Sequence, residues 1–210
     1  MRNYYNPIMK TPNESIVTTG RKAIAKATRA LMALEERLDE EFMHAVVAIA
    51  ECRGRLIVTG MGKSGHVARK IAATLTSTGT RAIFLHAGEA LHGDLGIIAP
   101  EDVVLALSYS GETEEVVRVA QFAKSNGNTI IAMTAAKHST LANDANIILN
   151  TIVEDEGSIL DIVPTASTTL QLALGDAIAA ALMELKGFHA TDFARLHPGG
   201  YIETRIETKN

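Results

Sequence analysis

The sequence predicts a doubly wound α/β fold, in which a five-stranded parallel sheet carries helices on both faces. Two observations support this prediction. Short runs rich in Val, Ile and Leu recur along the chain, at residues 55–60, 82–86, 103–108, 129–133 and 146–150. Continuous apolar runs of this length are typical of strands buried on both faces. Segments with helical spacing of apolar residues separate these runs, and such alternation favours a parallel sheet of the flavodoxin-like type.

The individual elements follow in order. Apolar residues recur at helical spacing over about residues 15–52, so the chain is expected to begin with a helical region. Further helices are expected at 64–78, 113–126 and 139–144, between the strands. The last long helix, at about 165–186, is apolar nearly all round, which predicts burial in the core or at a subunit interface. Gly187 follows it as a stop signal.

Composition narrows the class of protein. The 210 residues suit a single domain, and a net charge of −4 without a basic run argues against nucleic-acid binding. Cys52 is the one cysteine, so no internal disulfide can form, which fits a reducing cytoplasm. The first 15 residues lack a signal peptide pattern, and the apolar stretch 170–185 carries Asp176 and is short for a membrane span of ~20 residues. We therefore expect a cytoplasmic protein without a membrane segment.

The loop TGMGKSG at 59–65 follows the first predicted strand and allows three interpretations. A triphosphate loop would need a glycine where Ile57 stands. A dinucleotide loop would need an acid at the end of the second strand, but Glu89 lies past that end. The third interpretation is a glycine turn that packs a helix closely on a strand.

The loop after the third predicted strand offers hydroxyl groups. Ser108, Ser110 and Thr113 precede or open a helix, whose N-terminal amides and dipole favour an anion. This combination predicts a site for a compact phosphate monoester. Helix capping is the alternative, and it explains one such hydroxyl more readily than three.

Several stretches together resemble a known family. TGMGKSG and LSYSGETEE are similar to the sugar isomerase (SIS) domain, and HAGEALHGDLG, VPTASTT, GDA and FARLHPGG extend the similarity along nearly the whole chain. The set resembles the D-arabinose 5-phosphate isomerases, which interconvert that sugar with D-ribulose 5-phosphate. Many members continue into a pair of CBS domains. Here the sequence ends ten residues after Gly200, so we expect one SIS domain over 1–210 without that pair.

The resemblance implies four catalytic residues. Lys63 would stabilise an enediolate or orient an oxygen, and Glu115 and Glu156 would form the acid/base pair, in an order that the sequence leaves open. His197 would open the sugar ring or move protons between oxygens, in the site of a neighbouring subunit. Each residue type also has a structural explanation: a surface lysine, acids that complement a helix dipole, and a solvated loop histidine.

The resemblance also implies contacts with the substrate. They come from seven residues: Ser64, Gly79, Thr80, His92, Ser108, Ser110 and Thr113. Ser64 could equally cap a helix. His86 could be a buried core residue or, together with the other histidines, could capture an inhibitory divalent metal. No cofactor is required, and no spacing demands a structural zinc.

The leading hypothesis is therefore an aldose–ketose isomerase for a small sugar phosphate, acting as a homotetramer with sites at subunit interfaces. The resemblance implies a supply of arabinose 5-phosphate for Kdo, the eight-carbon acid sugar of lipopolysaccharide or capsule. One alternative is an SIS module that senses phosphosugars without converting them. Another is a different SIS isomerase, such as the zinc-using phosphoheptose type.

Overall fold

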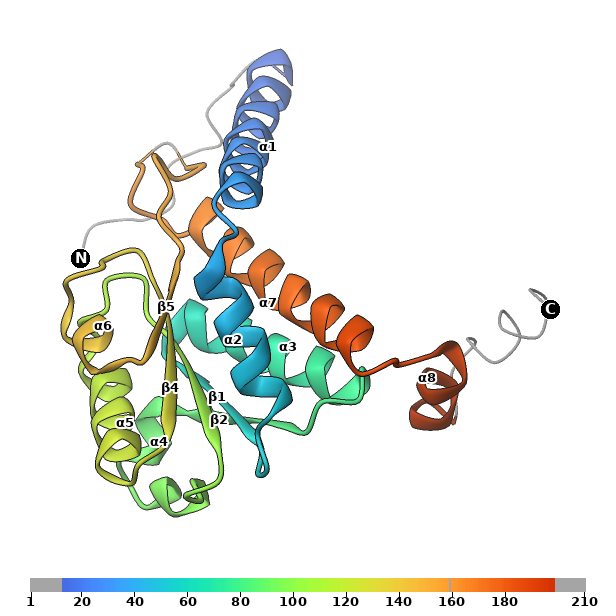
Figure 1. Ribbon diagram of the computed structural model, residues 1–210. Helices are drawn as coiled ribbons and strands as arrows, with labels where there is room; N and C mark the ends of the chain where they lie inside the picture. The colour runs from blue at the N-terminus through green and yellow to red at the C-terminus, as the bar shows by residue number, and fades with distance from the viewer. Residues whose placement is uncertain (1–12, 159, 199–210) are drawn as a thin grey trace.

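The computed structural model of the chain describes residues 13–158 and 160–198 (Figure 1). Its centre is a parallel sheet whose strands run in the order β2-β1-β3-β4-β5. The strands are β1 (Leu56–Gly60), β2 (Ala82–His86), β3 (Val103–Leu107), β4 (Thr129–Thr134) and β5 (Ile147–Asn150). This order is that of a doubly wound sheet, so the predicted fold class is confirmed.

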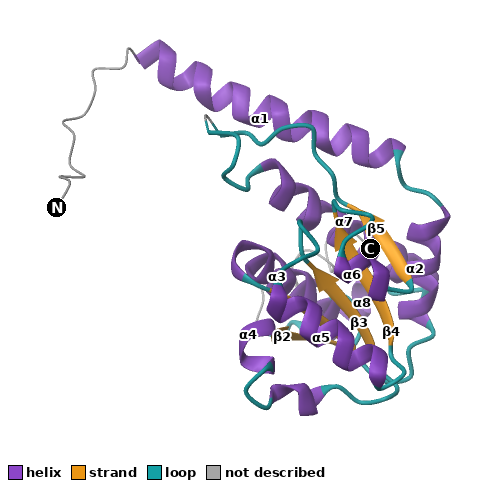
Figure 2. Cartoon of the chain, turned by 90° about the vertical axis from the view of Figure 1, so that its left-hand side faces the viewer, coloured by secondary structure: helices purple, strands orange, loops and turns teal. Residues whose placement is uncertain are grey.

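Helices cover both faces of the sheet, as Figure 2 shows. One face packs against α2 (Glu40–Ala50), α3 (Gly62–Ser77) and α7 (Ala166–Leu185), and the other against α4 (Ala87–Ala90), α5 (Glu114–Ser125) and α6 (Thr140–Asp144). Successive side chains of a strand point to opposite faces, so Val58 joins the first apolar cluster and Ile57 the second. Because both faces are buried, the central strands are apolar without alternation.

The N-terminal helical region is divided into two helices, α1 (Asn13–Glu36) and α2, rather than one. Asp39 lies in extended backbone between them, and its carboxylate accepts a hydrogen bond from the Glu41 N–H. Aspartate stabilises a helix start better than a helix interior, which explains the break that apolar spacing alone did not predict.

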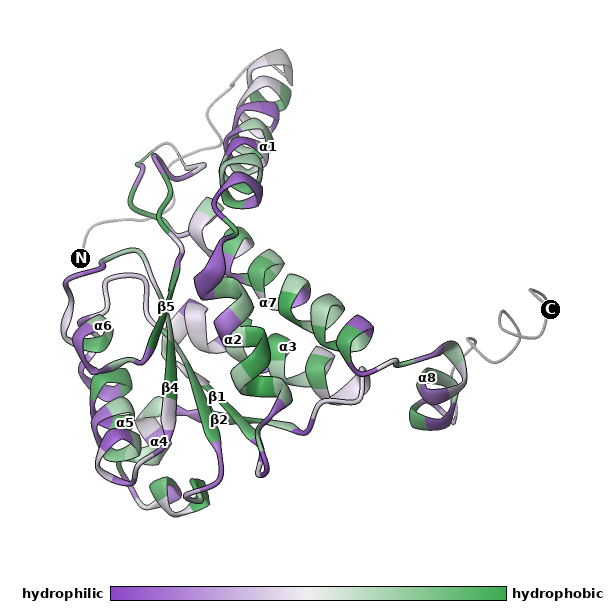
Figure 3. Cartoon of the chain, in the orientation of Figure 1, coloured by the Kyte–Doolittle hydropathy of each residue, from purple (hydrophilic) through white to green (hydrophobic). Residues whose placement is uncertain are grey.

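Helix α7 is long and largely apolar (Figure 3). Among the described residues it is the one helix long and apolar enough to cross a membrane. It packs against α1, α2 and α3, and Leu170, Leu174 and Ile178 are buried in the core beneath them. Burial of this kind explains the apolar composition of α7, as the sequence predicted.

Three short elements were not predicted: α4, the 3-10 helix η1 (Asp94–Ile97) and α8 (Ala190–Leu196). In Figure 1, α8 lies at the far end of α7 and apart from the sheet. Just before it, the Phe188 ring lies so close to Gly79 that a Cβ there would be 2.7 Å away. Lys186 donates a hydrogen bond to the Thr80 hydroxyl at 3.0 Å. The start of α8 is therefore attached near the amino end of β2.

The strand order determines where a ligand can bind. The chain leaves β1 toward one edge of the sheet and leaves β3 toward the other, which makes the gap between them a topological switch point. Gly60 and Leu107 are register partners at the carboxyl ends of these two strands. The loops that follow β1 and β3 therefore lie side by side, at the edge where doubly wound proteins bind ligands.

Candidate functional site

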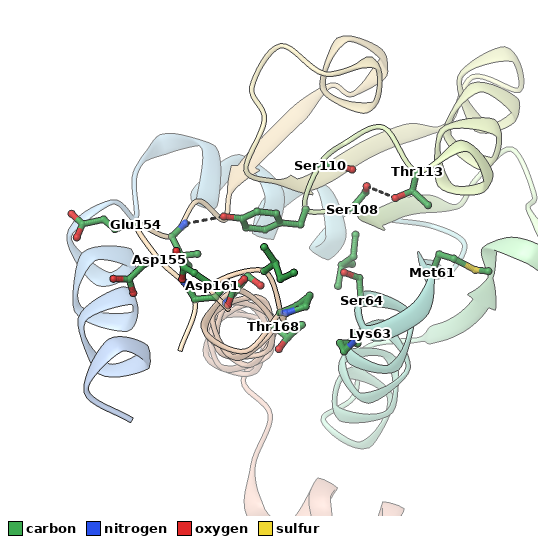
Figure 4. A pocket seen from close by; sticks show the side chains of 17 residues that line it. Met61, Lys63, Ser64, Ser108, Ser110, Thr113, Glu154, Asp155, Asp161 and Thr168 are labelled. Carbon is green, nitrogen blue, oxygen red and sulfur yellow. Dashed lines mark hydrogen bonds between the residues drawn. The ribbon is translucent and has the colours of Figure 1, made fainter. Parts of the chain in front are cut away.

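A cavity of about 560 Å³ opens at this carboxyl edge (Figure 4). Its wall combines the loops after β1, β3 and β5 with the first turn of α7. The polar lining residues are Lys63, Ser64, Ser108, Tyr109, Ser110, Thr113, Glu154, Asp155, Glu156, Asp161, Ser167 and Thr168. Six of the twelve residues assigned to the site from sequence line this one cavity: Lys63, Ser64, Glu156, Ser108, Ser110 and Thr113.

The loop after β1 brings the start of α3 to the cavity. A Cβ on Gly65 would lie 2.9 Å from the Gly60 carbonyl oxygen, so both glycines allow the helix to pack closely on the strand. This contact supports the third interpretation of TGMGKSG, a packing turn. Met61 precedes α3 and gives no side-chain cap, so the first N–H groups of the helix stay open beside Lys63.

The loop after β3 forms a tight hydroxyl cluster. Ser108 and Thr113 share a hydrogen bond of 3.0 Å, and Ser108 also accepts one from the Gly111 N–H at 3.1 Å. Gly111 has a φ of +68°, and a Cβ there would overlap the Ser139 hydroxyl, so glycine is required. Thr113 gives α5 no side-chain cap. The capping explanation therefore fails for Thr113, and the N-terminus of α5 is available to an anion.

Glu156 forms the opposite part of the wall and is 9% exposed. Its Oε2 atom accepts hydrogen bonds from the N–H groups of Thr165 at 2.8 Å and Ser167 at 3.1 Å. Burial opposes ionisation of this carboxyl, but hydrogen bonds from the Ser167 side chain and from the first N–H groups of α7 outweigh it. The pKa of Glu156 is consequently lowered, and the carboxylate is charged at neutral pH.

Other lining residues were missed by sequence reasoning. Tyr109 accepts a hydrogen bond from the Val153 N–H at 3.5 Å, and thereby joins the loops after β3 and β5. Ser64, which was assigned to the site from sequence, donates to the fully buried Gln171 of α7 at 3.2 Å. The stretch VPTASTT does hold a signal, since Pro164 followed by Thr165 and Ser167 is typical of a helix start that exposes N–H donors.

Three residues assigned to the site from sequence lie near the same edge but outside the wall of this cavity. Glu115 is half-buried in the first turn of α5, and His92 is exposed in the turn after α4. His86 ends β2, and its Nδ1 accepts a hydrogen bond from the Glu89 N–H at 3.4 Å. Its ring packs edge-on against Phe84, which is the contact expected of a structural histidine.

Three further residues lie elsewhere. Gly79 and Thr80 line a separate hollow with Lys186, Phe188 and Arg195. His197 directly follows α8; its ring stacks on Phe193 with centroids 3.9 Å apart, and its Nδ1 lies 2.8 Å from the Phe193 carbonyl oxygen. A single chain thus does not bring His197 to Lys63 and Glu156.

Across residues 13–158 and 160–198, no group of three or more His, Cys, Asp or Glu side chains is arranged to hold a metal ion. A metal at His86 stays a prediction.

Glu112, in the same loop as Ser108, has a lowered pKa because the N–H and hydroxyl of Thr140 donate to its carboxylate. Glu112 therefore links the loop before α5 to the start of α6, which is a structural role.

Fold and cavity together define a doubly wound α/β protein with a polar cavity at its switch point. Comparison with known proteins identifies the family. The SIS domain family matches residues 48–181, and the chain belongs to that family.

The similar proteins carry consistent names. Arabinose 5-phosphate isomerase KpsF of Escherichia coli O6:H1 is 44% identical over 195 residues, which are 92% of this chain and 60% of that protein. Arabinose 5-phosphate isomerase KdsD of Pseudomonas aeruginosa is 45% identical over 197 residues, or 94% and 60% of the two chains. The chain thus spans about 60% of the length of these relatives.

A solved structure agrees with them. The E. coli CFT073 protein c3406, in complex with arabinose 5-phosphate, has a TM-score of 0.86 and 37% identity to this chain. The match covers 90% of this chain and all of that one.

Proposed function

We propose that the protein is an aldose–ketose isomerase that interconverts D-ribulose 5-phosphate and D-arabinose 5-phosphate. One observation carries the proposal: the cavity combines an open anion site at the starts of α3 and α5 with a lysine and an ionised carboxylate. The names of the relatives and the ligand of the similar E. coli structure support the choice of substrate.

The phosphate would bind at Ser108, Ser110 and Thr113, where hydroxyls and the N-terminus of α5 favour a dianion. That position leaves the carbonyl end of the open sugar to extend toward Lys63 and Glu156.

The chemistry moves one proton between neighbouring carbons. From the aldose, a base takes the proton on C2, the C–H electron pair becomes the C1=C2 double bond, and O1 gains a proton. The enediol then receives a proton on C1 while O2 loses its own, which leaves the ketose carbonyl at C2. Atoms and electrons balance without a redox partner.

Glu156 suits the base, because its carboxylate is already ionised and lines the cavity. Lys63 would stabilise the enediolate through its charge. Glu115 and His197 would supply the second proton transfer and ring opening. Neither lies in the cavity wall of one chain, so the proposal includes a homotetramer whose neighbouring copies complete each site.

The exposed apolar residues fit such an assembly. Ile16, Ile24 and Met32 are each at least 60% exposed along α1, and Ile162 is 78% exposed at the rim of the cavity. Exposed apolar side chains of this size are often covered at interfaces. Cytoplasmic location and service to Kdo synthesis remain predictions.

The test is a coupled assay on protein treated with a chelator, with ribulose 5-phosphate and a panel of other pentose and hexose phosphates. We expect turnover with the pentulose phosphate and no need for metal or nucleotide. Binding of sugar phosphates by thermal shift without any turnover would instead indicate the sensing module. Loss of activity on chelation would indicate an isomerase of the zinc-using type.

A further inference from the structure

The short segment that carries Glu156 is held from outside the cavity by α1. Lys26, on α1, donates a hydrogen bond to the Glu156 backbone carbonyl at 2.8 Å. The same ammonium pairs with Asp155 at 3.2 Å and lies 3.9 Å from Asp161. A side chain from the first helix thereby contacts the main chain of a cavity residue 130 positions later.

Asp161 holds the other side of the same residue. Its Oδ1 accepts a hydrogen bond from the Glu156 backbone N–H. Asp161 has a φ of +52°, the one positive φ outside glycine among the described residues. That conformation is unfavourable for most side chains, although aspartate and asparagine tolerate it better than others. The unusual backbone brings the carboxylate back toward Glu156 and Lys26.

Glu156 is therefore fixed at three points. The Glu156 N–H donates to Asp161, and its carbonyl oxygen accepts from Lys26. One oxygen of its carboxylate accepts from the start of α7. Gly157, the next residue, donates to the Thr165 hydroxyl at 2.8 Å and lies against Ala23 of α1. A helix cap would need only the last of the three contacts.

We propose that Lys26 and Asp161 are positioning residues that hold Glu156 at the geometry required for proton transfer. The inference rests on the proposed function, since it takes Glu156 as the base. Neither residue needs to contact the reacting carbons. Misplacement of a catalytic group by about 1 Å can cost ~10²-fold in rate, so a partly loosened segment should cost about tenfold.

The first experiment compares Lys26→Met with Lys26→Arg, which keeps the charge and donors, and with Lys22→Met, an exposed lysine one turn earlier on α1. We expect kcat to fall about tenfold in Lys26→Met, with KM changed less than threefold, and to recover in Lys26→Arg. Lys22→Met should match the parent protein. Equal kcat in Lys26→Met and Lys22→Met would overturn the proposal.

The second experiment separates positioning from backbone strain. Asp161→Gly relieves the positive φ but removes the acceptor, whereas Asp161→Asn keeps an acceptor oxygen and a tolerated φ. If the acceptor matters, Asp161→Gly loses about tenfold in kcat at an unchanged or raised Tm, and Asp161→Asn loses less. If Asp161→Gly keeps the kcat of the parent protein, Asp161 does not position Glu156.

A readout without turnover distinguishes this inference from the function on which it rests. The charged groups around Glu156 are Lys26 from α1, three acids of its own loop and Lys63 in the wall of the same cavity; the acids are Glu154, Asp155 and Asp161. Carboxyl NMR titration, assigned with Glu156→Gln, should show a higher Glu156 pKa in Lys26→Met than in the parent and restoration in Lys26→Arg. A parent protein without isomerase activity would reject the proposed function alone. An unchanged Glu156 pKa in Lys26→Met would reject the proposal that Lys26 positions Glu156.

Discussion

The two sides of the cavity use helix N-termini in opposite ways. On the acidic side, the start of α7 is occupied by the Glu156 carboxylate, which satisfies its first N–H groups from within the chain. On the hydroxyl side, the starts of α3 and α5 have no side-chain cap and face open space beside Ser108 and Lys63. An occupied terminus fixes a protein group, and an open one can receive a ligand's charge.

The comparison predicts different kinetic effects on the two sides. Groups on the acidic side should act on the reaction rate, and groups on the hydroxyl side on substrate affinity. Four predictions test this division.

The largest effect is expected for Glu156→Gln. The amide keeps the shape of the side chain but cannot accept a proton, so kcat should fall about 10³-fold with little change in KM. Steady-state kinetics with ribulose 5-phosphate measures both. Glu154→Gln, on the neighbouring exposed acid, removes the same charge and should lose far less. Similar losses in the two variants would mean that charge alone matters on this side.

Lys63→Met should have the next largest effect. Lys63 lies in the first turn of α3, on the hydroxyl side, and is the expected exception to the division. Loss of its charge removes stabilisation from the enediolate, which lowers kcat about 10²-fold. Lys63→Arg should recover part of the rate. A rise in KM at constant kcat would instead assign Lys63 to phosphate binding, like the other groups of the hydroxyl side.

Ser110→Ala should act on affinity. A hydrogen bond to a charged group contributes roughly 1.5–3 kcal/mol, so KM should rise by about one to two orders of magnitude with kcat nearly unchanged. Ser125→Ala, an exposed serine at the other end of α5, is the matched control. A selective loss of kcat in Ser110→Ala would contradict the division between the sides.

The smallest effect is on stability in acid. Glu156 has a lowered pKa in the folded protein, so its contribution is present above the ordinary value of 4.5 and is lost as pH falls below that value toward the folded pKa. The free energy of unfolding of the parent should therefore decrease more steeply in this window than that of Glu156→Gln. Urea titrations at several pH values measure the difference, and parallel curves would show that the helix start does not stabilise the anion.

The fold was largely predictable from the sequence, because strands buried on both faces are apolar throughout and stand out from helical periods. The break between α1 and α2 was not predicted, because the helical spacing of apolar residues continues on both sides of Asp39. The five predicted strands and the main helices between them match the structure to within two residues or so at their ends.

The cavity was predictable only in part. Lys63, Ser108 and Thr113 directly follow or lie close to strand ends, and topology alone brings such residues together. Lys26 gives no such signal, because its contact with Glu156 depends on how α1 packs against α7. The places of Glu115 and His197 in the reaction remain predictions, since they depend on how copies of the chain assemble.

The packing of α1 on α7 also has a consequence for synthesis on the ribosome. Helix α1 is made first, yet its partner α7 is made nearly last, after the whole sheet. At ordinary elongation rates the interval lasts roughly ten seconds, during which the apolar face of α1 lacks its native neighbour. The nascent chain is therefore expected to need protection of its first helix until α7 emerges, and Glu156 can reach its final position only after that late docking.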